Sequence, residues 1–250
     1  MKINPIFERL ALLTGEEGLE KLKKTNVLIF GAGGVGSWAA EALVRSGIGK
    51  IGIIDNDTVC ASNVNRQAEA TSLSIGLPKA SCLKAHLLVI NPECDVTAYD
   101  ALYSRENENL FGIENADFVI DAIDSLNHKL DLIEKAASTK AVLFSSMGMA
   151  LRLDPSLIKA ASIWKTDGCP LARLVRYRLR KRGFTGDFTA VYSSEKTVPP
   201  AAFKSDQTGA NQEQPDAGNQ KRANGSIVTV TGSAGFMLAG LVIRNVIDNF

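Results

Sequence analysis

The sequence has no cysteines spaced as Cys-x-x-Cys and few aromatic residues. Its four cysteines, Cys60, Cys82, Cys94 and Cys169, lie far apart, and only two histidines could join them. This spacing argues against a structural zinc site and against a disulfide framework. We therefore expect no zinc and a reducing, cytoplasmic location. Aromatic residues make up only 6% of the 250 residues, so the strands must depend on Val, Ile and Leu.

An excess of charge of one sign is also missing. The formal charge is +1, which excludes a global attraction to nucleic acid or to anionic membranes, so such a partner must bind a local patch. The N-terminal stretch does not resemble a secretory signal. The longest apolar-leaning stretch, residues 227–243, is interrupted by three glycines and by hydroxyl residues. A membrane span needs about 20 mostly apolar residues, so we expect no stable membrane insertion there.

Apolar strand segments alternate with helical segments in residues 20–150. The strand VLIF at 27–30 is followed by glycines, by a helix with apolar residues at helical spacing, and by the strand IGII at 51–54. This βαβ order predicts an α/β fold with a Rossmann-like, doubly wound, mostly parallel sheet. Further helices are expected over 16–24, 79–90 and 126–137, and further strands over 95–98, 118–120 and 141–144.

Residues 151–250 form a smaller and less regular C-terminal part. Residues 204–225 contain no large apolar side chain, so we interpret them as a mobile loop or a disordered insert. The elements expected around this insert are strands over 157–163, 188–192 and 226–230 and helices over 170–182 and 233–247. We expect both parts to belong to one compact domain.

The segment GAGGVG at 31–36 places Gly31, Gly33, Gly34 and Gly36 between a predicted strand and a predicted helix. Glycine lets the backbone approach a phosphate without a Cβ, and the helix N-terminus offers free N–H groups and a positive dipole end. Glycines also make tight strand-to-helix turns, which is the alternative for the motif taken alone. The flanking strand and helix favour a nucleotide site.

Asp55 follows the second predicted strand, where an acid reaches ribose hydroxyls in dinucleotide sites. The local sequence DND, which also contains Asp57, suits a simple turn as well. These features alone favour a NAD-dependent oxidoreductase. However, the sequence has no His- or Tyr-based group of residues for hydride transfer.

Two cations further along the chain favour a different nucleotide. The segment SNVNRQ contributes Asn63, Arg66 and Gln67, and Lys79 begins the next predicted helix. Arginine clamps phosphate oxygens through two N–H groups and lysine supplies a point charge, so the pair suits a triphosphate. A solvated position is the alternative for either cation alone.

Two acids follow the fourth predicted strand, in the segment DAIDS. An acid at the carboxyl end of a strand, facing phosphates, can hold Mg²⁺ through its oxygens. Asp121 could instead cap the next helix or line the crevice of the sheet, and Asp124 is favoured as the metal ligand partly because a family resemblance implies it.

Together these segments resemble the ubiquitin-activating-enzyme-like adenylating enzymes, a family that includes the sulfur-carrier adenylyltransferases of molybdopterin and thiamine synthesis. The matching pieces are GAGGVG, IDND, SNVNRQ, GLPKA, INPEC and DAIDS, in family order. The resemblance implies that residues 1–150 bind ATP and adenylate a carboxylate. It also implies that Asp55 holds the ribose, that Asn63, Arg66 and Lys79 contact phosphates, and that Asp124 coordinates Mg²⁺. The expected nucleotide site comprises Gly31, Gly33, Gly34, Gly36, Asp55, Asp57, Asn63, Arg66, Gln67 and Lys79.

Arg9, in IFERLALLTG, matches an N-terminal arginine that reaches into the partner subunit's site in dimers of this family. The resemblance therefore implies a homodimer, with residues 151–250 serving the substrate and the dimer contact. It completes a catalytic set of Arg9, Arg66, Lys79 and Asp124. A surface arginine whose stem covers apolar neighbours is the alternative for Arg9.

Segments of the second half narrow the resemblance to one branch, the dehydratases that act on threonylcarbamoyladenosine in tRNA. They are DGCPLARLVRYRLRKRGF, VYSSE and the terminal GSIVTVTGSAGFMLAGLVI, with GSWAAEALVRSGIG from the first half. This branch adenylates the threonyl carboxylate, and attack within the same substrate then closes a cyclic form with loss of AMP. The alternative is adenylation of the C-terminus of a ubiquitin-like sulfur carrier, although the missing Cys-x-x-Cys motifs depart from that zinc-bearing branch. A sulfur-relay protein is a further candidate partner, and Cys169 is either a sulfur-transfer nucleophile or a small buried thiol.

The expected helix at 170–182 is the only dense positive patch in the sequence. It could contact tRNA phosphates, or it could be a solvated basic face or a contact with the partner subunit. The residues assigned to tRNA are Arg173, Arg176, Arg180, Lys181 and Arg182. A non-catalytic nucleotide-binding or scaffold protein is the remaining class.

Overall fold

The computed structural model describes residues 3–198 and 224–248. Its strands are β1 (Asn26–Phe30), β2 (Lys50–Ile54), β3 (Asp95–Tyr99), β4 (Phe118–Asp121), β5 (Val142–Ser146), β6 (Ile158–Ser162) and β7 (Thr189–Ser193). Its α-helices are α1 (Glu8–Lys24), α2 (Gly36–Arg45), α3 (Lys79–Ile90), α4 (Leu126–Ala137), α5 (Pro170–Lys181) and α6 (Val228–Asp248).

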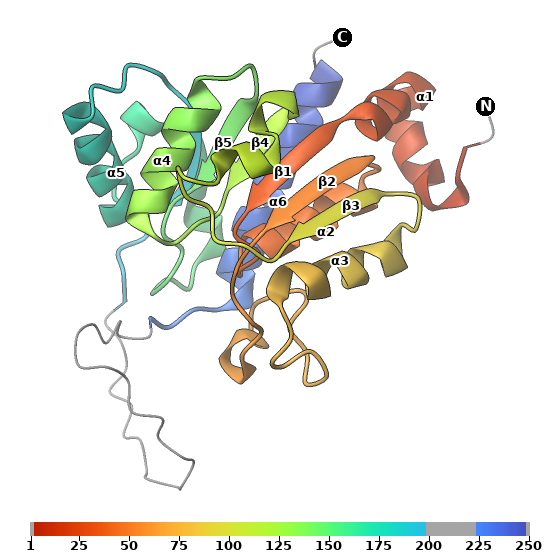
Figure 1. The fold of residues 1–250 in the computed structure, drawn as a ribbon, viewed down its shortest axis with the longest axis horizontal. Coiled ribbons are helices and arrows are strands. Elements are labelled where there is room, and N and C mark those ends of the chain that lie inside the picture. Colours follow the sequence, from red (N-terminus) through yellow and green to blue (C-terminus); the bar gives the residue numbers. More distant parts are fainter. Residues whose placement is uncertain (1–2, 199–223, 249–250) are drawn as a thin grey trace, which may run out of the picture.

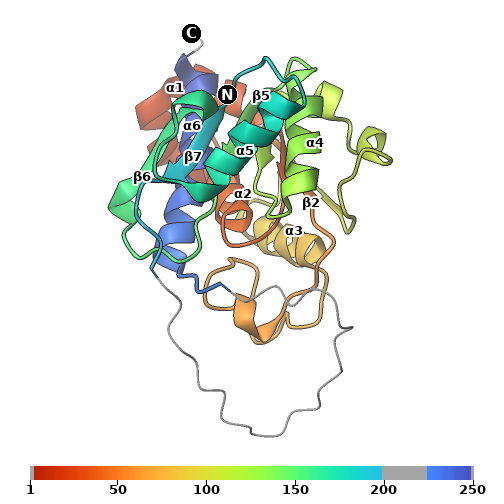
Figure 2. The same cartoon turned by 90° about the vertical axis from the view of Figure 1, so that its left-hand side faces the viewer.

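The strands form one seven-stranded sheet in the order β3-β2-β1-β4-β5-β7-β6. Figure 1 labels β1 to β5, and Figure 2 labels β6 and β7. Neighbouring strands run parallel, except that β6 pairs antiparallel with β7. The predicted Rossmann-like, mostly parallel sheet is therefore confirmed. The two strands from the C-terminal part extend the sheet that the first part begins.

Side chains alternate between the two faces of the sheet, so each face has its own core. Val27 and Ile29 of β1 join the core under α1, α2, α3 and α6. Leu28 and Phe30 of the same strand join the core under α4 and α5. The two helical layers are visible on either side of the sheet (Figures 1 and 2). A parallel sheet buried on both faces requires such continuous apolar strands.

The C-terminal helix differs from the sequence prediction. A strand over 226–230 and a separate helix were expected, but Val228–Asp248 is one helix. The β-branched run at its start favours a strand locally, yet Val230, Ala234 and Leu238 are buried at helical spacing, and this packing overrides the local propensity. The prediction of a strand there is wrong for that reason.

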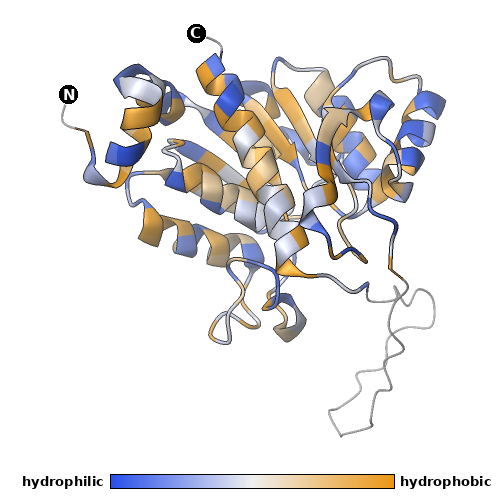
Figure 3. Ribbon diagram, turned by 180° about the vertical axis from the view of Figure 1, so that it is seen from behind, coloured by the Kyte–Doolittle hydropathy of each residue, from blue (hydrophilic) through white to orange (hydrophobic). Residues whose placement is uncertain are grey.

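Helix α6 packs closely on α2 through a glycine. A Cβ at Gly235 would lie 2.5 Å from the carbonyl oxygen of Val35, so only glycine allows this approach. By length and composition α6 could cross a membrane. In the fold it runs diagonally across the rear face of the sheet, with apolar and weakly polar residues along most of its length (Figure 3). We therefore interpret it as a core helix.

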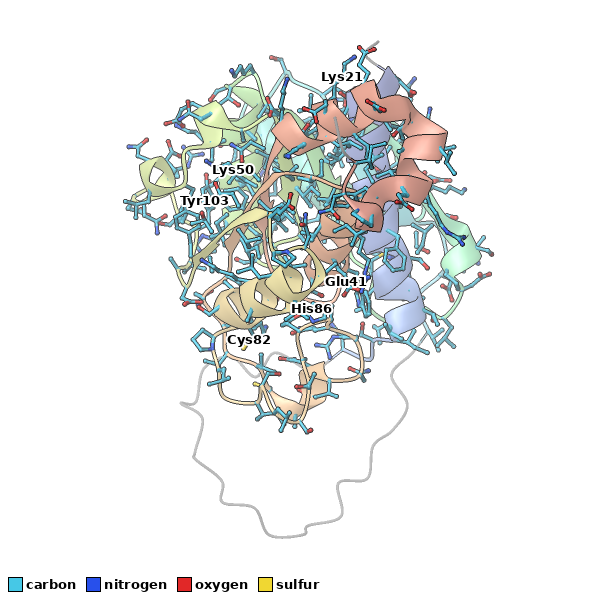
Figure 4. The ribbon with its side chains drawn as sticks, turned by 90° about the vertical axis from the view of Figure 1, so that its right-hand side faces the viewer. Lys21, Glu41, Lys50, Cys82, His86 and Tyr103 are labelled. Atoms are coloured by element: carbon cyan, nitrogen blue, oxygen red, sulfur yellow. The ribbon has the colours of Figure 1, made fainter. Side chains whose placement is uncertain are left out.

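Two smaller features of the fold concern helices α1 and α3. Helix α1 begins at Glu8, earlier than predicted, and bends at Gly15, which has a φ of 71°. Helix α3 is tied to α2 by His86, whose Nε2 lies 2.9 Å from Oε2 of Glu41 (Figure 4). The predicted insert at 204–225 lies outside the described residues, apart from Asn224 and Gly225.

Candidate active site

The site lies where the strand order reverses, at the carboxyl ends of β1 and β4. The chain leaves β1 to form β2 on one side and later adds β4 on the other side. In open parallel sheets, two connections that diverge in this way leave a crevice where ligands bind. A cavity of about 530 Å³ opens at this point. Its walls come from the glycine loop, from the segments after β2, β3, β4 and β5, and from the start of α6.

The positions in the 31–36 loop require or accommodate glycine for different structural reasons. Gly31 has a φ of 97°, and a Cβ there would lie 2.7 Å from the carbonyl oxygen of Ala122. A Cβ at Gly36 would lie 1.8 Å from the carbonyl oxygen of Gly31, so Gly36 closes the turn and does not line the cavity. Gly33 lines the cavity, and its nearest neighbour would be 3.8 Å away. Only Gly33 thus leaves open space that a ligand could fill.

Asp55 braces the glycine loop from the next strand. Its Oδ2 accepts a hydrogen bond from the N–H of Ala32 at 2.7 Å, and its Oδ1 accepts one from the N–H of Asp57 at 2.8 Å. Burial raises the pKa of Asp55, and these two backbone N–H groups lower it in part. The carboxylate lines the cavity, where further lone pairs could accept ribose hydroxyls.

Lys79 and Arg66 both line the cavity. Lys79 is buried, and its Nζ lies 2.8 Å from Oδ2 of Asp57, whose side chain is 62% exposed. Arg66 is half-buried and donates to the carbonyl oxygen of Ser62 at 2.6 Å and to the side chain of Asn65 at 3.0 Å. The two predicted cations are therefore brought to one cavity, held by contacts that a phosphate could replace.

The loop that carries Arg66 also buries polar groups. Asn63 Oδ1 accepts from the N–H of Cys60 at 2.9 Å, which braces the loop. Gln67 is buried and lines the cavity, and its Oε1 has no hydrogen-bond partner among the described residues. The same holds for both carboxylate oxygens of Glu69, which is 4% exposed. Burial raises the pKa of Glu69 to about 7, while Lys79 opposes the shift.

The two acids after β4 have different surroundings. Asp121 is fully buried and bonded to Nζ of Lys129 at 2.7 Å. Asp124 is exposed and lines the cavity, where it can reach a ligand. Within residues 3–198 and 224–248, no three His, Cys, Asp or Glu side chains gather as a metal site. A metal ion here would take most of its ligands from phosphate or water.

Several wall residues were missed by the sequence reasoning. They follow β3 and β5, or they come from the C-terminal part of the chain. The carboxyl ends of β3 and β5 were predictable places for ligand contacts, but α6 gave no local signal. These residues are Ala101, Leu102, Tyr103, Met147, Gly148, Met149, Ala150, Leu171, Asn224 and Thr231.

Arg9 does not line this cavity. It is exposed on α1, the helix that leads into the amino end of β1, whereas the glycine loop follows the carboxyl end of that strand. Beside it, Leu12 and Leu13 are 91% and 83% exposed. Within one chain the structure therefore separates Arg9 from the other predicted catalytic residues.

One arginine of the basic helix α5, and the arginine directly after that helix, form contacts within the chain. Arg176 donates to the carbonyl oxygen of Thr166 at 2.9 Å. Arg182 pairs with Asp131 at 2.7 Å and with Glu134 at 3.1 Å. Arg173, Arg180 and Lys181 are exposed, with Arg180 over the ring of Trp164 and Lys181 over that of Tyr177. Cys169, just before this helix, is buried.

Comparison with known proteins gives consistent results. A family model described as the ThiF family matches residues 7–249. The tRNA threonylcarbamoyladenosine dehydratase of Bacillus subtilis (strain 168) is 42% identical over 192 residues, which cover 77% of this chain and 76% of that protein. The enzyme of the same name from Escherichia coli (strain K12) is 35% identical over 250 residues, covering 95% and 92%. A crystal structure of the E. coli tRNA N6-threonylcarbamoyladenosine dehydratase in complex with ATP aligns with a TM-score of 0.84 and 31% identity, covering 100% and 98%.

Proposed function

Since the chain belongs to the ThiF family, we propose that it is an ATP-dependent dehydratase acting on threonylcarbamoyladenosine in tRNA. One observation carries the proposal. A single cavity at the switch point of the sheet is lined by Gly33, Arg66, Lys79 and Asp124. These are an open glycine, two cations and an acid, which together suit a triphosphate with its metal.

ATP fits the surroundings of this cavity. Gly33 leaves room for a phosphate, and Gln67 presents a buried polar side chain whose Oε1 accepts no hydrogen bond from the described part of the chain. Arg66 and Lys79 would neutralise phosphate charge, with the phosphates taking over from Asp57 at the Lys79 ammonium. Asp55 would keep the glycine loop in place and accept a ribose hydroxyl.

Mg²⁺ fits Asp124 by the same reasoning. Mg²⁺ in phosphoryl-transfer sites is commonly bound by one or two carboxylates together with substrate phosphates. Asp124 offers the hard oxygen ligand at the cavity wall. The ion would supply charge neutralisation for the departing pyrophosphate.

The reaction divides into two steps. An oxygen of the threonyl carboxylate attacks the α-phosphorus of ATP, and pyrophosphate leaves with the electron pair of the broken P–O bond. The resulting acyl-adenylate has a good leaving group. A nucleophilic atom of the same substrate then attacks the activated carbonyl, AMP leaves with the electron pair of the broken C–O bond, and the substrate releases one proton to solvent as the ring closes. The chain's task is to orient both substrates and neutralise charge, and no protein nucleophile is needed.

The wall that would receive the nucleoside combines residues after β5 with residues of the C-terminal part. Met147 and Met149 after β5 and Leu171 of α5 give this wall an apolar surface, and Asn224 and Thr231 add polar groups. The wall lies in the same cavity as the phosphate-binding loop, so a carboxylate seated against it would be close to the α-phosphate. We assign residues 1–150 to ATP and residues 151–250 to the substrate and the dimer contact.

Exchange of labelled pyrophosphate into ATP tests the reaction. Exchange should require tRNA that carries threonylcarbamoyladenosine, and the cyclic nucleoside should be found by mass spectrometry of the digested tRNA. Unmodified transcript of the same tRNA is the control. Exchange with a ubiquitin-like carrier and none with modified tRNA would favour sulfur-carrier activation, and no ATP binding would refute both activities.

Single substitutions test the site residues. Lys79→Met and Asp124→Asn should each lower the adenylation rate by roughly 100-fold, as loss of one charge-stabilising group does. Lys140→Met, at an exposed lysine, is the matched control. Circular dichroism and thermal unfolding establish that each variant is folded. Near-normal turnover in a folded variant removes that residue from the site.

We further propose that the active unit is a homodimer in which Arg9 completes the partner subunit's site. The support is its exposure beside Leu12 and Leu13 and its absence from the cavity of its own chain. Mixing Arg9→Ala subunits with Lys79→Ala subunits should restore part of the activity, because one site of each hybrid dimer keeps both residues. No rescue in demonstrated hybrid dimers would refute action between subunits.

Exposed cations of α5 are proposed to contact tRNA. Arg173→Glu with Lys181→Glu should weaken tRNA binding and reduce its salt slope by about 0.9 for each phosphate that the protein no longer neutralises. Arg182→Gln is the comparison, because that side chain pairs with Asp131. Unchanged binding across salt concentrations would refute tRNA contact by these cations.

We also propose a cytoplasmic location and a sulfur-relay protein partner. Cell fractionation tests the location, and affinity capture tests the partner.

A further inference from the structure

A fully buried ion pair lies directly behind the cavity. Nζ of Lys129, in the first turn of α4, lies 2.7 Å from Oδ2 of Asp121, and both side chains are 0% exposed. The hydroxyl of Ser145 donates to the same carboxylate oxygen at 2.6 Å. None of these residues lines the cavity.

The pair joins two walls of the site. Through Oδ1, Asp121 accepts the N–H of Ile123 at 3.1 Å, which fixes the loop that carries Asp124. Through its remaining hydrogens, Lys129 donates to the carbonyl oxygen of Ser146 at 3.0 Å, where the wall after β5 begins. One ammonium thus connects the loop after β4 to the wall after β5.

The loop after β4 is also confined by the glycine loop. The backbone of Ala122 is so close to Gly31 that a Cβ there would lie 2.7 Å from its carbonyl oxygen. The segment before Asp124 is therefore held between the glycine loop and the Asp121–Lys129 pair. A small change in this pair would shift the Asp124 carboxylate relative to the phosphate loop.

Stability alone does not account for charges at this position. Taking two ions out of water is costly, and apolar side chains of similar volume often stabilise a fold equally well. A buried lysine that donates to two acceptors fixes the directions of the accepting groups, which apolar packing does not do. These fixed directions determine the geometry of the two walls.

We propose that Lys129 is a positioning residue, which sets the place of the Asp124 loop against the wall after β5 and thereby the affinity for the nucleotide-bound metal ion. This inference rests on the proposed function, in which Asp124 holds Mg²⁺. Lys129 acts through Asp121 and touches neither substrate nor metal.

The test uses the near-isosteric double variant Asp121→Asn/Lys129→Met of the full chain, which removes both charges together. Lys129→Met alone leaves an unpaired buried carboxylate and is at risk of not folding. Lys135→Met is the matched control, because Lys135 lies on the same helix and forms an ion pair with Glu108 at 3.1 Å. Asp124→Asn is the benchmark for loss of the metal ligand itself.

Two readouts besides activity are measured. Electron paramagnetic resonance gives the binding of Mn²⁺ in the presence of ATP, and hydrogen exchange gives the protection of amides 122–126. In the double variant we expect Mn²⁺ affinity to fall by about tenfold, as loss of supporting residues around a metal site commonly causes. Protection of the Ile123 amide should fall as well, while thermal unfolding stays close to that of the unmodified chain. Lys135→Met should change neither readout.

A folded double variant with normal Mn²⁺ affinity and normal protection would overturn the proposal. A double variant that does not fold would also overturn it, because the pair would then serve stability. If Asp124→Asn binds Mn²⁺ with ATP as well as the unmodified chain does, the proposed metal site fails. The exchange measurement then still decides whether Lys129 fixes the loop.

Discussion

The variant Glu69→Gln should gain stability relative to the unmodified protein as the pH rises from 5 to 8. Burial raises the pKa of this carboxyl group from 4.5 to about 7, and this effect outweighs the opposing effects of its own backbone N–H and of Lys79. The folded state therefore binds a proton more tightly than the unfolded state. Stability falls as pH rises from the unfolded pKa through the folded one.

The two pKa values set the size of the effect. By linkage, ionisation of Glu69 costs about 2.5 kcal/mol of unfolding free energy between pH 5 and pH 8. Glutamine does not ionise, so the Glu69→Gln variant avoids this cost. The two amide hydrogens of the variant add a penalty of their own, but that penalty is the same at both pH values. The difference between pH 5 and pH 8 isolates the ionisation.

Urea unfolding of both proteins at pH 5, 6, 7 and 8 measures the effect. The free-energy difference between variant and unmodified protein should shift in favour of the variant by about 2.5 kcal/mol over this range, with most of the change below pH 7. Glu16→Gln, at an exposed position, is the control and should show no such trend. A pH-independent difference for Glu69→Gln would refute a raised pKa at this buried carboxyl group.

Five further substitutions test the glycine loop, the packing of α6 and the environment of Glu41. Gly33→Ala should leave the unfolding free energy within about 0.5 kcal/mol, since its Cβ would meet only Nε2 of Gln67, at an ordinary contact distance of 3.8 Å. It should weaken ATP binding about tenfold by calorimetry. Gly36→Ala should lower both stability and ATP binding, because its Cβ would lie 1.8 Å from the carbonyl oxygen of Gly31. Gly235→Ala should destabilise the α2–α6 contact by about 1–3 kcal/mol in urea unfolding, whereas Gly240→Ala, with nothing near its Cβ, should stabilise by about 0.5–1 kcal/mol. Burial raises the pKa of Glu41, but hydrogen bonds from His86 and Arg45 lower it below its usual value, so Glu41→Gln should cost more stability at pH 7 than at pH 4. Equal costs at both pH values, equal effects of the two helix glycines, or unchanged ATP binding in Gly33→Ala would each contradict the reasoning.

Local apolar runs made most of the fold predictable. The strands at 27–30 and 51–54 are short continuous runs, and such runs occur where a parallel sheet is buried on both faces. The start of α6 was mispredicted because the β-branched run at 228–231 favours a strand locally. Its helical state depends on packing against α2, and Gly235 shows that contact only once the partner backbone is known.

The residues of the candidate site also form two groups, those that sequence motifs indicate and those that only the structure reveals. Arg66, Lys79 and Asp124 belong to motifs whose spacing is visible in the sequence, and the structure brings them to one cavity. Thr231 reaches that cavity from a helix distant in sequence, so no local pattern indicates it. The basic helix shows the limit of counting charges, since Arg176 is engaged by a threonine on another segment.

The crossing of α6 over α2 has a consequence for how the protein is made. The glycine loop, Arg66 and Lys79 leave the ribosome well before Thr231, which stands 152 residues after Lys79 in the chain. A partly made chain has the loop without the wall that encloses it. A nucleotide bound in the cavity would therefore stabilise, by mass action, a chain that includes α6, whereas a nascent chain that still lacks α6 has an incomplete site. Until then the early strands must hold together by their own packing.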